Sequence, residues 1–374
     1  MSSERVVIVG GGVLGTMHAL EARRRGFDVV HLEADATPRR ASVRNFGLIW
    51  VSGRAAGTEL ALALRARELW TEHASRVSGL LLRPIGSVTV AADDLELAVM
   101  GELADGNDAG IRGVELLDPA GVRRLNPAIR GEIAGGLWCS KDAVVEPGEV
   151  LIALRRYLNT SDAYTWAPGR RVLEVAERAV TDHCGVRHEG DRIVLCPGDQ
   201  LTGIGGAVGL DLAAAPIRRC RLQMMQTEPD AEYLATAVAD GDSMRYYPAF
   251  DLASRAGLGH PSEATARWAM QLLLVQRASG GLTIGDTHVY DEPFDFAVEE
   301  APYDDLKARA EHILGRRLPP VRRRWAGVYS IVGDDRIYYR SNVLPGVEIV
   351  TAPAGRGMTL SPAIAEQTFE RSGS

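Results

Sequence analysis

The sequence predicts an α/β fold that contains a Rossmann-type dinucleotide-binding domain, and three observations support this prediction. The first 33 residues have the order strand, glycine turn, helix, strand and acidic residue. Two later stretches, 191–198 and 347–352, have the apolar pattern of further strands. At 374 residues the chain exceeds the usual size of a single hydrophobic core, so we expect two domains.

A glycine-rich turn follows the first predicted strand. Residues 6–9 are a continuous β-branched run, the pattern of a strand that is buried on both faces. Gly10, Gly12 and Gly15 then form the spacing G-x-G-x-x-G. Gly10 permits a tight turn, Gly12 lets the backbone approach a pyrophosphate, and Gly15 lets the next helix pack closely on the strand. This spacing predicts a binding site for the phosphates of a dinucleotide.

The elements after this turn complete the pattern. Residues 13–25 can form a helix, whose N-terminus offers free N–H groups and positive partial charge to phosphates. Residues 27–32 form a second strand that ends at Glu33. A carboxylate there accepts both hydroxyls of an adenosine ribose, as in FAD and NAD sites, and repels a 2′-phosphate. A βαβ unit that binds no nucleotide is the alternative, and the completeness of the pattern argues against it.

Composition and charge narrow the class of protein. With 46% hydrophobic residues, 24% charged residues and a net charge of −7, the chain is typical of a globular protein and not of a nucleic-acid binder. Its four cysteines have no metal-binding spacing, so we expect reduced thiols, no metal site and a cytoplasmic protein. We expect neither a membrane span nor a signal peptide, because apolar runs are short and few residues precede the first strand.

A polar loop follows the second strand. Residues 38–50 read P-R-R-A-S-V-R-N-F-G-L-I-W and carry Ser42, Arg44 and Asn45. A glycine fingerprint that ends in Glu33 and continues into such a segment resembles the D-amino acid oxidase and glycine/sarcosine oxidase superfamily of FAD enzymes. The resemblance implies that this loop runs beside the flavin ring. A surface salt bridge is the alternative role for Arg44.

The middle of the chain alternates between predicted strands and helices. Apolar periodicity predicts helices over 55–78, 94–108, 150–159, 263–271 and 304–314. Strands are predicted over 84–92, 171–175, 180–187, 191–198, 218–227, 271–276 and 282–289. Asp142, Val145 and Pro147 match the family's D-x-x-V-x-P turn, which implies a crossing between the substrate region and the flavin domain. The resemblance further places Val172 near the adenine and Gly198 near the FAD phosphates.

The C-terminal segment carries the second part of the resemblance. Residues 355–362 read G-R-G-M-T-L-S-P and resemble the family's G-x-G-M-x-L-x-P signature at the start of the final helix. A helix N-terminus stabilises the negative charge that a reduced flavin carries at N1 and C2=O. The cofactor-binding residues predicted here are Gly355, Arg356, Gly357, Met358 and Thr359. The resemblance now covers essentially the whole chain.

The resemblance implies an interleaved organisation. Segments 1–83, 145–215 and 325–374 build the FAD-binding domain, and segments 84–144 and 216–324 build a substrate domain of α+β type around an antiparallel sheet. FAD is expected to be non-covalent, because Gly327 lies near the place of the cysteine that attaches flavin in monomeric sarcosine oxidases.

The family chemistry is the oxidation of a small amine to an imine, which water hydrolyses to a carbonyl compound. The cofactor carries the hard chemistry, and no protein base is strictly required. Many amino-acid oxidases of this superfamily hold the substrate carboxylate with an arginine in A-G-x-R-P, and this chain has Tyr329 there. A tyrosine cannot form a bidentate ion pair, which disfavours an α-amino acid substrate. A glycine, sarcosine or D-amino acid oxidase or dehydrogenase remains the alternative.

The stretch 285–290, G-D-T-H-V-Y, is similar to a subgroup associated with the degradation of aminoalkylphosphonates. Its proposed substrates are 2-aminoethylphosphonate and the N-methyl derivative. A phosphonate needs several donors, and the candidates are Tyr246, Tyr247, His288, Tyr329, Tyr338 and Arg340. We assign the catalytic and substrate-binding roles to Tyr329, His288, Arg340 and Tyr247, although core packing is the alternative for each aromatic residue. A second alternative is an FAD-dependent protein without amine oxidase activity; the electron acceptor (oxygen or another) and the oligomeric state stay open.

Overall fold

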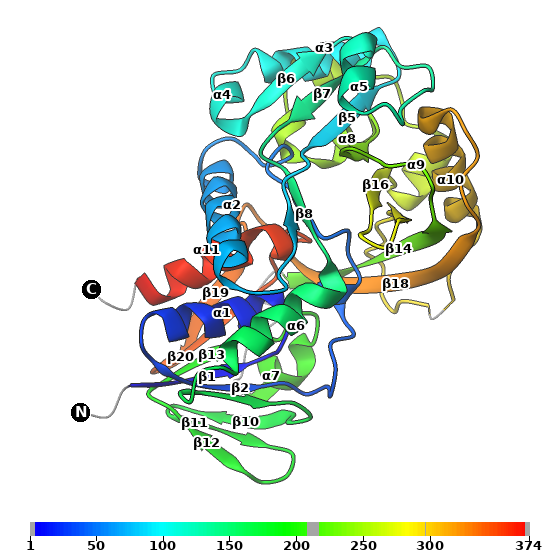
Figure 1. Cartoon of the computed structure of the whole chain (residues 1–374). Coiled ribbons are helices and arrows are strands. Elements are labelled where there is room, and N and C mark those ends of the chain that lie inside the picture. The colour runs from blue at the N-terminus through cyan, green and yellow to red at the C-terminus, as the bar shows by residue number, and fades with distance from the viewer. Residues whose placement is uncertain (1–3, 208–216, 296, 371–374) are drawn as a thin grey trace.

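The computed structural model describes residues 4–207, 217–295 and 297–370 (Figure 1). Within these residues the strands form a six-stranded sheet, an eight-stranded sheet and two three-stranded sheets. The mixed α/β fold class predicted from the sequence is therefore confirmed. None of the helices in this part of the chain combines the length and the apolar character that crossing a membrane requires.

Five neighbouring strands of the six-stranded sheet run parallel, and the sixth is antiparallel at one edge. In spatial order they are β19 (Tyr339–Leu344), β20 (Val347–Thr351), β13 (Arg192–Leu195), β1 (Arg5–Val9), β2 (Asp28–Leu32) and β9 (Tyr164–Ala167). Val6 and Ile8 of β1 pack against the helices on one face, whereas Val7 and Val9 pack into a separate cluster on the other. The predicted burial of this strand on both faces is confirmed.

Different layers cover the two faces of this sheet (Figure 1). Helices lie on one face: α1 (Val13–Arg24), α6 (Pro147–Leu158), α11 (Gly357–Glu370) and, packed on α11, α2 (Thr58–Arg76). A three-stranded sheet lies on the other: β10 (Val172–Ala176), β11 (Ala179–Asp182) and β12 (Arg187–Glu189), with α7 (Leu201–Ala207) beside β10. Helix α6 begins at Pro147, before the predicted start at residue 150, because proline suits the first turn of a helix.

The eight-stranded sheet is antiparallel except where β15 and β5 run parallel. In spatial order its strands are β18 (Val321–Val332), β14 (Ile217–Pro229), β17 (Gly281–Gly285), β16 (Leu273–Gln276), β15 (Ala237–Ala239), β5 (Ser87–Ala91), β7 (Gly135–Cys139) and β6 (Val114–Leu117). Its helices are α3 (Asp94–Ala104), α4 (Ala109–Arg112), α5 (Pro119–Leu125), α8 (Ser243–Tyr246), α9 (Glu263–Trp268) and α10 (Ala301–Leu314). Short 3-10 turns lie at Ala41–Val43, Pro248–Phe250 and Ala253–Gly257.

Strand β17 ends earlier than the sequence predicts, at Gly285 instead of residue 289. Beyond it the pairing is irregular: the Asp286 N–H donates to the Gln271 carbonyl, and Val289 pairs with Arg221 as an isolated bridge. This irregular segment carries Asp286 and His288, and it borders the cavity described below.

A small sheet links the two large ones: β3 (Leu48–Ile49), β8 (Ala143–Val145) and β4 (Leu82–Arg83). Strand β8 runs between the two halves of the molecule (Figure 1). Just before it, the fully buried Asp142 carboxylate accepts hydrogen bonds from the Val51 and Ser52 N–H groups and from the Ser52 and Ser87 hydroxyls. The D-x-x-V-x-P turn thereby fixes the loop that follows β3.

The two large sheets draw on the segments that the sequence separates. All strands of the six-stranded sheet lie within 1–83, 145–215 and 325–374. The eight-stranded sheet draws on 84–144 and 216–324, but β18 continues across residue 325 and pairs with β14 on both sides of it. The boundary at 215–216 lies outside the described residues. The division into two domains stays a prediction.

Candidate functional site

A cavity of about 700 Å³ lies between the six-stranded and eight-stranded sheets and is lined by residues of both. Its volume falls in the range of sites for small molecules and cofactors. One end is formed by the glycine turn after β1 and the loop 38–50. The other end is formed by α8, β16 and the segment after β17.

The glycine turn is closely packed at two of its three positions. A Cβ atom on Gly10 would lie 2.2 Å from the Cys196 carbonyl oxygen, and one on Gly15 would lie 1.9 Å from the Gly10 carbonyl oxygen. Gly10 also has φ +114°, which side chains rarely allow. A Cβ on Gly12 would lie 3.0 Å from the Ser42 hydroxyl oxygen. These contacts form the close backbone approach that the dinucleotide pattern requires.

Glu33 lies at the predicted place, beside this turn. Its carboxylate accepts hydrogen bonds from the Gly11 and Asp35 N–H groups, the latter at 2.8 Å. Arg155, which the sequence interpretation did not include, donates to the Gly11 carbonyl and stacks 4.1 Å from the Trp166 ring. A carboxylate has about four acceptor positions, so Glu33 keeps capacity for ribose hydroxyls.

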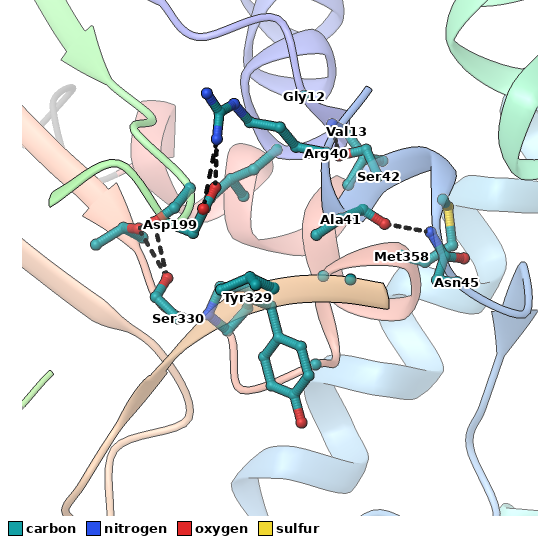
Figure 2. Close-up of a pocket in the computed structure, with 18 of the residues that line it drawn as sticks. Gly12, Val13, Arg40, Ala41, Ser42, Asn45, Asp199, Tyr329, Ser330 and Met358 are labelled. Atoms are coloured by element: carbon teal, nitrogen blue, oxygen red, sulfur yellow. Dashed lines mark hydrogen bonds and ion pairs between the residues drawn. The ribbon is translucent and has the colours of Figure 1, made fainter. Parts of the chain in front are cut away.

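The loop 38–50 closes over the glycine turn, as Figure 2 shows. The Ser42 hydroxyl accepts a hydrogen bond of 2.9 Å from the Val13 N–H at the start of α1. The Asn45 side chain donates to the Ala41 carbonyl at 2.8 Å and accepts from the Gly47 N–H at 2.7 Å, so it holds the loop itself. Arg44 donates to the Ala326 carbonyl of β18 at 2.8 Å. Within the described residues Arg44 forms no salt bridge, the alternative that the sequence left open.

Val172 and Gly198 line the same end of the cavity. The Gly198 carbonyl accepts hydrogen bonds from the Ser330 hydroxyl at 2.8 Å and the Thr351 hydroxyl at 3.1 Å. Burial raises the pKa of the neighbouring Cys196 thiol, which therefore stays protonated and unreactive.

The C-terminal signature borders the middle of the cavity. Helix α11 begins at Gly357, and the Thr359 hydroxyl accepts a hydrogen bond of 2.9 Å from the Trp50 N–H. All five predicted residues, 355–359, line the cavity. The Tyr329 ring packs against Gly355 and points away from the neighbouring Ser330, because successive side chains of β18 face opposite sides (Figure 2).

Aromatic side chains gather at the other end. The Tyr246 and Tyr329 hydroxyl oxygens are 3.2 Å apart, and the Tyr246 ring stacks on the His288 ring at 4.2 Å. Tyr247 meets Tyr246 edge-on at 5.1 Å. Surrounding protein raises the pKa of all three tyrosines, so their phenols stay neutral hydrogen-bond donors. Four predicted substrate residues therefore lie together: Tyr246, Tyr247, His288 and Tyr329.

Arg340, which the sequence assigned to the substrate anion, does not line this cavity. It sits on the edge strand β19, where it donates to the Ile364 carbonyl of α11 at 2.9 Å and approaches Glu348 at 3.3 Å. Tyr338 also lies outside the cavity and donates to the Gln367 side chain at 2.9 Å. Both side chains fasten β19 to α11 instead of facing a ligand.

Two arginines other than Arg340 line the cavity at this position. Arg54 and Arg356 both line the cavity, and they share the Glu59 carboxylate at 3.4 and 3.1 Å. Arg54 lies 5.5 Å from the Tyr247 ring. Two positive charges against one negative charge leave this cluster with a net charge of about +1. We call Arg54, Glu59 and Arg356 the arginine cluster.

The loop that carries Arg54 is held rigidly. Arg112, 1% exposed, donates to the carbonyls of Val51, Ser52 and Arg54, the last at 2.7 Å. With Asp142 on the other side, both N–H and C=O groups of this loop are satisfied. No local pattern around Arg112 or Arg54 indicates these roles, which arise from contacts between distant segments.

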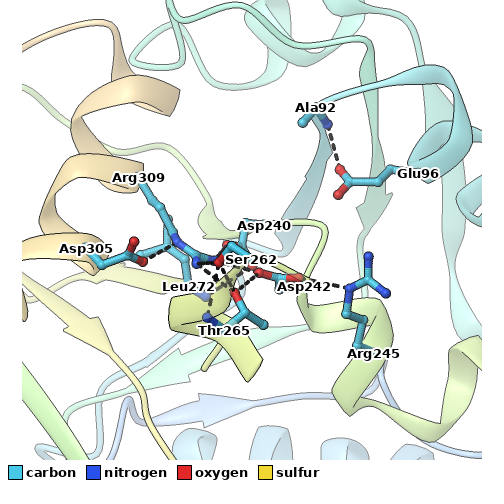
Figure 3. Close-up of polar contacts among 10 residues, drawn as sticks. All are labelled: Ala92, Glu96, Asp240, Asp242, Arg245, Ser262, Thr265, Leu272, Asp305 and Arg309. Atoms are coloured by element: carbon cyan, nitrogen blue, oxygen red, sulfur yellow. Dashed lines mark hydrogen bonds and ion pairs between the residues drawn. The ribbon is translucent and has the colours of Figure 1, made fainter. Parts of the chain in front are cut away.

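A polar network supports the turn that carries Tyr246 and Tyr247 (Figure 3). Asp242 precedes α8, and its carboxylate bonds to Arg245 at 3.0 Å and to Arg309 of α10 at 2.6 Å. Asp240 approaches the same guanidinium at 3.2 Å. Burial and the nearby Asp242 raise the pKa of Asp240 to about 7, while Arg309 opposes the rise. Arg309 thus lies between two close carboxylates and offsets part of their mutual repulsion.

We expect Arg309→Ala to lower the free energy of unfolding by about 3 kcal/mol, because it leaves the largely buried Asp240 without a cation and Asp242 with Arg245 alone. The raised pKa of Asp240 means that the folded state takes up a proton before the unfolded state does as the pH falls below about 7. At pH 5 the folded state holds Asp240 mostly protonated, so the carboxyl group no longer needs a cation. The loss of unfolding free energy in Arg309→Ala should therefore be smaller at pH 5 than at pH 8. Urea titrations at both pH values measure this, with Arg317→Ala, whose side chain is 89% exposed, as the control. An equal loss of unfolding free energy at both pH values would contradict the pairing of Arg309 with an Asp240 carboxyl group of raised pKa.

One cluster of possible metal ligands lies away from the cavity. Asp182, His183 and Cys184 each offer a ligand atom within 4.8 Å of the others. The Asp182 carboxylate already accepts from His188 at 3.0 Å and from two backbone N–H groups. These bonds explain its position without a metal.

Comparisons with known proteins agree with this geometry. The family model described as DAO, FAD dependent oxidoreductase, matches residues 5–371. An opine oxidase subunit from Rhizobium meliloti is 25% identical over 243 residues, which cover 60% of this chain and 63% of that protein. This chain thus matches less than two thirds of that relative's length.

Solved structures resemble the whole fold. Glycine oxidase from Geobacillus kaustophilus superposes with a TM-score of 0.76 at 19% identity, covering 98% of this chain and 94% of that one. L-proline dehydrogenase from P. horikoshii gives a TM-score of 0.80 at 17% identity, covering 99% and 93%. At these identities the likeness shows a shared fold.

Proposed function

Because this chain belongs to the DAO family of FAD dependent oxidoreductases, we propose that it oxidises a small amine that carries a remote anion, preferably an aminoalkylphosphonate, to an aldehyde. The substrates proposed are 2-aminoethylphosphonate and its N-methyl derivative. Glycine, sarcosine or a D-amino acid is the second candidate, since the arginine cluster would also accept a carboxylate.

The residues at the glycine end fit FAD. Replacing Gly10 or Gly15 by any larger residue would fill space that the backbone occupies, which supports a turn built for close approach. We propose that Gly10, Gly12, Gly15 and Ser42 hold the pyrophosphate, that Glu33 holds the ribose, and that Val172 contacts the adenine. Arg44, Asn45, Gly198 and residues 355–359 complete the site. When bound, FAD supplies the two-electron acceptor for the hydride that leaves the carbon next to the substrate nitrogen.

The arginine cluster is the observation that carries the substrate proposal. Arg54 and Arg356 line the cavity with a net charge of about +1, beside the neutral phenols of Tyr246 and Tyr329. Guanidinium and phenol groups are suitable donors for the oxygens of a phosphonate. A phosphonate with up to two negative charges would use both arginines more fully than a carboxylate. His288 and Tyr247 complete this donor set.

The chemical test is product analysis with the purified holoenzyme and an artificial two-electron acceptor. We expect 2-aminoethylphosphonate to give the phosphonoaldehyde and ammonia, in amounts equal to the acceptor reduced. The N-methyl derivative should give an aldehyde and an amine in the same ratio. Formation of a 2-oxo acid from glycine or D-alanine, with no aldehyde from either phosphonate, would replace the phosphonate proposal by the amino-acid alternative.

We expect FAD to be bound without a covalent link, because the one cysteine among the described cavity-lining residues, Cys196, is a buried and protonated thiol. Acid precipitation should leave the yellow colour in the supernatant. Glu33→Arg should weaken FAD binding by about tenfold or more, since a hydrogen bond to a charged group contributes about 1.5–3 kcal/mol. The exposed Glu115→Arg on β6 is the matched control. Colour that remains in the pellet would contradict the non-covalent assignment.

A further inference from the structure

Three buried polar atoms at the substrate end of the cavity have no partner. They are Oδ1 of Asp286, Oε1 of Gln271 and Nε1 of Trp50, and no described residue offers any of them a hydrogen bond. All three residues line the cavity and are at least 95% buried. Buried polar atoms are nearly always paired in native proteins, so a missing ligand is a physical explanation for such a group.

Two of these atoms are acceptors that the backbone brings to one place. The Asp286 N–H donates to the Gln271 carbonyl at 2.9 Å, and the Gln271 N–H donates to the Asp286 carbonyl at 3.2 Å. Residues that exchange both bonds in this way project their side chains to the same face of a sheet. A carboxylate oxygen and an amide oxygen on the same face can both accept from a donor with several N–H groups, which is what a substrate ammonium offers.

The hydrogen bonds of His288 clarify its relation to Asp286. Its Nδ1 lies 2.8 Å from the Ala269 carbonyl oxygen, which can only accept, so Nδ1 carries a proton. Its Nε2 lies 3.7 Å from Oδ2 of Asp286. His288 therefore faces one oxygen of the carboxylate and leaves the other, Oδ1, to the cavity. Burial raises the pKa of Asp286, and His288 opposes that rise.

We propose that Asp286 binds the substrate ammonium together with Gln271 and takes one proton from it. This inference rests on the proposed function and deepens it. In this step an N–H bond of the ammonium breaks, its electron pair stays on nitrogen, and the proton bonds to a carboxylate oxygen of Asp286. No electrons change hands, so no further reactant is needed. The freed lone pair is what allows hydride to leave the neighbouring carbon.

The step matters because an alkylammonium has a pKa near 10.4, so only about one molecule in 10³ is neutral at pH 7.4. Five other ionisable side chains face Asp286: His288, Cys220, Tyr246, Tyr247 and Tyr290. Burial raises the pKa of Cys220 to about 11 and that of each tyrosine above its ordinary value, so these four stay protonated between pH 6 and 10. Of the groups that face it, His288 alone competes with Asp286 as the proton acceptor.

The pH dependence of kcat/KM separates the alternatives. The substrate is the fastest-oxidised member of a panel of 2-aminoethylphosphonate, its N-methyl derivative, glycine, sarcosine and D-alanine. With Asp286 as base, the wild-type profile is bell-shaped, with an acid limb from Asp286 and an alkaline limb from the amine. The kcat/KM of Asp286→Asn should instead rise tenfold per pH unit up to the pKa of the amine. Relative to the wild type, kcat/KM of Asp286→Asn should be lower by about 10²- to 10³-fold at pH 7 and by only a few-fold near pH 10.

Two variants serve as controls. Asp291→Asn removes an exposed carboxylate from the same segment and should keep the wild-type profile. His288→Asn should keep the acid limb, whatever its effect on the maximum. Loss of that limb in His288→Asn but not in Asp286→Asn would overturn the proposal in favour of the histidine. A wild-type profile that already rises with unit slope to the pKa of the amine would also overturn it, even if Asp286→Asn fails to fold.

A binding measurement gives a readout that does not depend on turnover. (2-Amino-2-methylpropyl)phosphonate has no hydrogen on the carbon next to nitrogen and cannot be oxidised there; (2,2-dimethylpropyl)phosphonate lacks the amine. At pH 7 the wild type should bind the amine at least tenfold more tightly, and Asp286→Asn should bind both alike. If carboxylates are the better substrates, 2-aminoisobutyrate and pivalate replace this pair. An equal preference in both proteins would overturn the proposal.

Different outcomes contradict the proposed function and the role of Asp286. If no amine of the panel reduces the flavin, the proposed function falls and this inference falls with it. If amines are oxidised while Asp286→Asn follows the wild-type profile at a uniformly lower rate, only the role of Asp286 falls.

Discussion

Gly15→Ala is expected to yield a protein that binds FAD about 5- to 150-fold more weakly than the wild type. The new Cβ would lie 1.9 Å from the Gly10 carbonyl oxygen, so the turn must open before the helix can pack. Overpacking of this kind costs about 1–3 kcal/mol, which corresponds to about 5- to 150-fold in affinity. Reconstitution of the apoprotein with FAD, followed by fluorescence, measures the dissociation constant.

The control is the same substitution at a glycine with open space around it. Gly148 lies in the first turn of α6, and a Cβ atom added there would have no neighbouring atom within 4 Å, so Gly148→Ala should bind FAD normally. Thermal midpoints of both apoproteins show whether Gly15→Ala is folded. A folded Gly15→Ala protein with wild-type affinity would show that this turn does not hold the pyrophosphate.

Arg356→Gln is expected to lower kcat/KM for an anionic amine by about 10- to 150-fold. The change removes a charge-assisted hydrogen bond, which typically contributes about 1.5–3 kcal/mol. It also leaves Glu59 to cancel the charge of Arg54, so the cluster becomes neutral. Oxidation of propylamine, which has no anion, should fall only as far as flavin binding weakens. The ratio of kcat/KM for 2-aminoethylphosphonate to that for propylamine isolates the effect from any change in flavin binding.

Arg340→Gln is the informative comparison, since the sequence alone assigned the anion to Arg340. Its guanidinium bonds to α11 and to Glu348, so the substitution should lower the thermal midpoint and leave the ratio unchanged. A collapse of the ratio in Arg340→Gln, with Arg356→Gln unaffected, would restore Arg340 as the anion-binding residue and reject the arginine cluster.

The parts of the fold that the sequence predicts well are those set by local spacing. The turn at Gly10, Gly12 and Gly15 and the acidic residue Glu33 depend on contacts within one βαβ unit, so their pattern is visible in 33 residues. The residues 355–359 are likewise placed by the start of a helix, and all line the cavity. Strand and helix ends are less well predicted, as at β17, where irregular pairing with Gln271 and Arg221 replaces the ladder.

The substrate end could not be predicted in the same way, because distant segments meet there. Arg340 follows two tyrosines in a segment near the flavin signature, but alternation along β19 turns it toward α11. Arg54 reaches the cavity only because Arg112 and Asp142 hold its loop. Asp286 lies inside the stretch G-D-T-H-V-Y, yet the sequence assigned its neighbour His288, since imidazole is a suitable donor to a phosphonate and a carboxylate is not.

The most direct test of the proposed function is anaerobic stopped-flow reduction of the bound flavin. The holoenzyme is mixed with 2-aminoethylphosphonate, its N-methyl derivative, glycine, sarcosine and D-alanine, each across a concentration series, and the loss of flavin absorbance is followed. We predict saturable bleaching by at least one phosphonate. For each amine, the limiting rate constant is divided by the half-saturating concentration. This ratio should be at least tenfold higher for that phosphonate than for any carboxylate. Fast bleaching by glycine or D-alanine with none by the phosphonates would contradict the proposed substrate, and no bleaching by any amine would contradict amine oxidation itself.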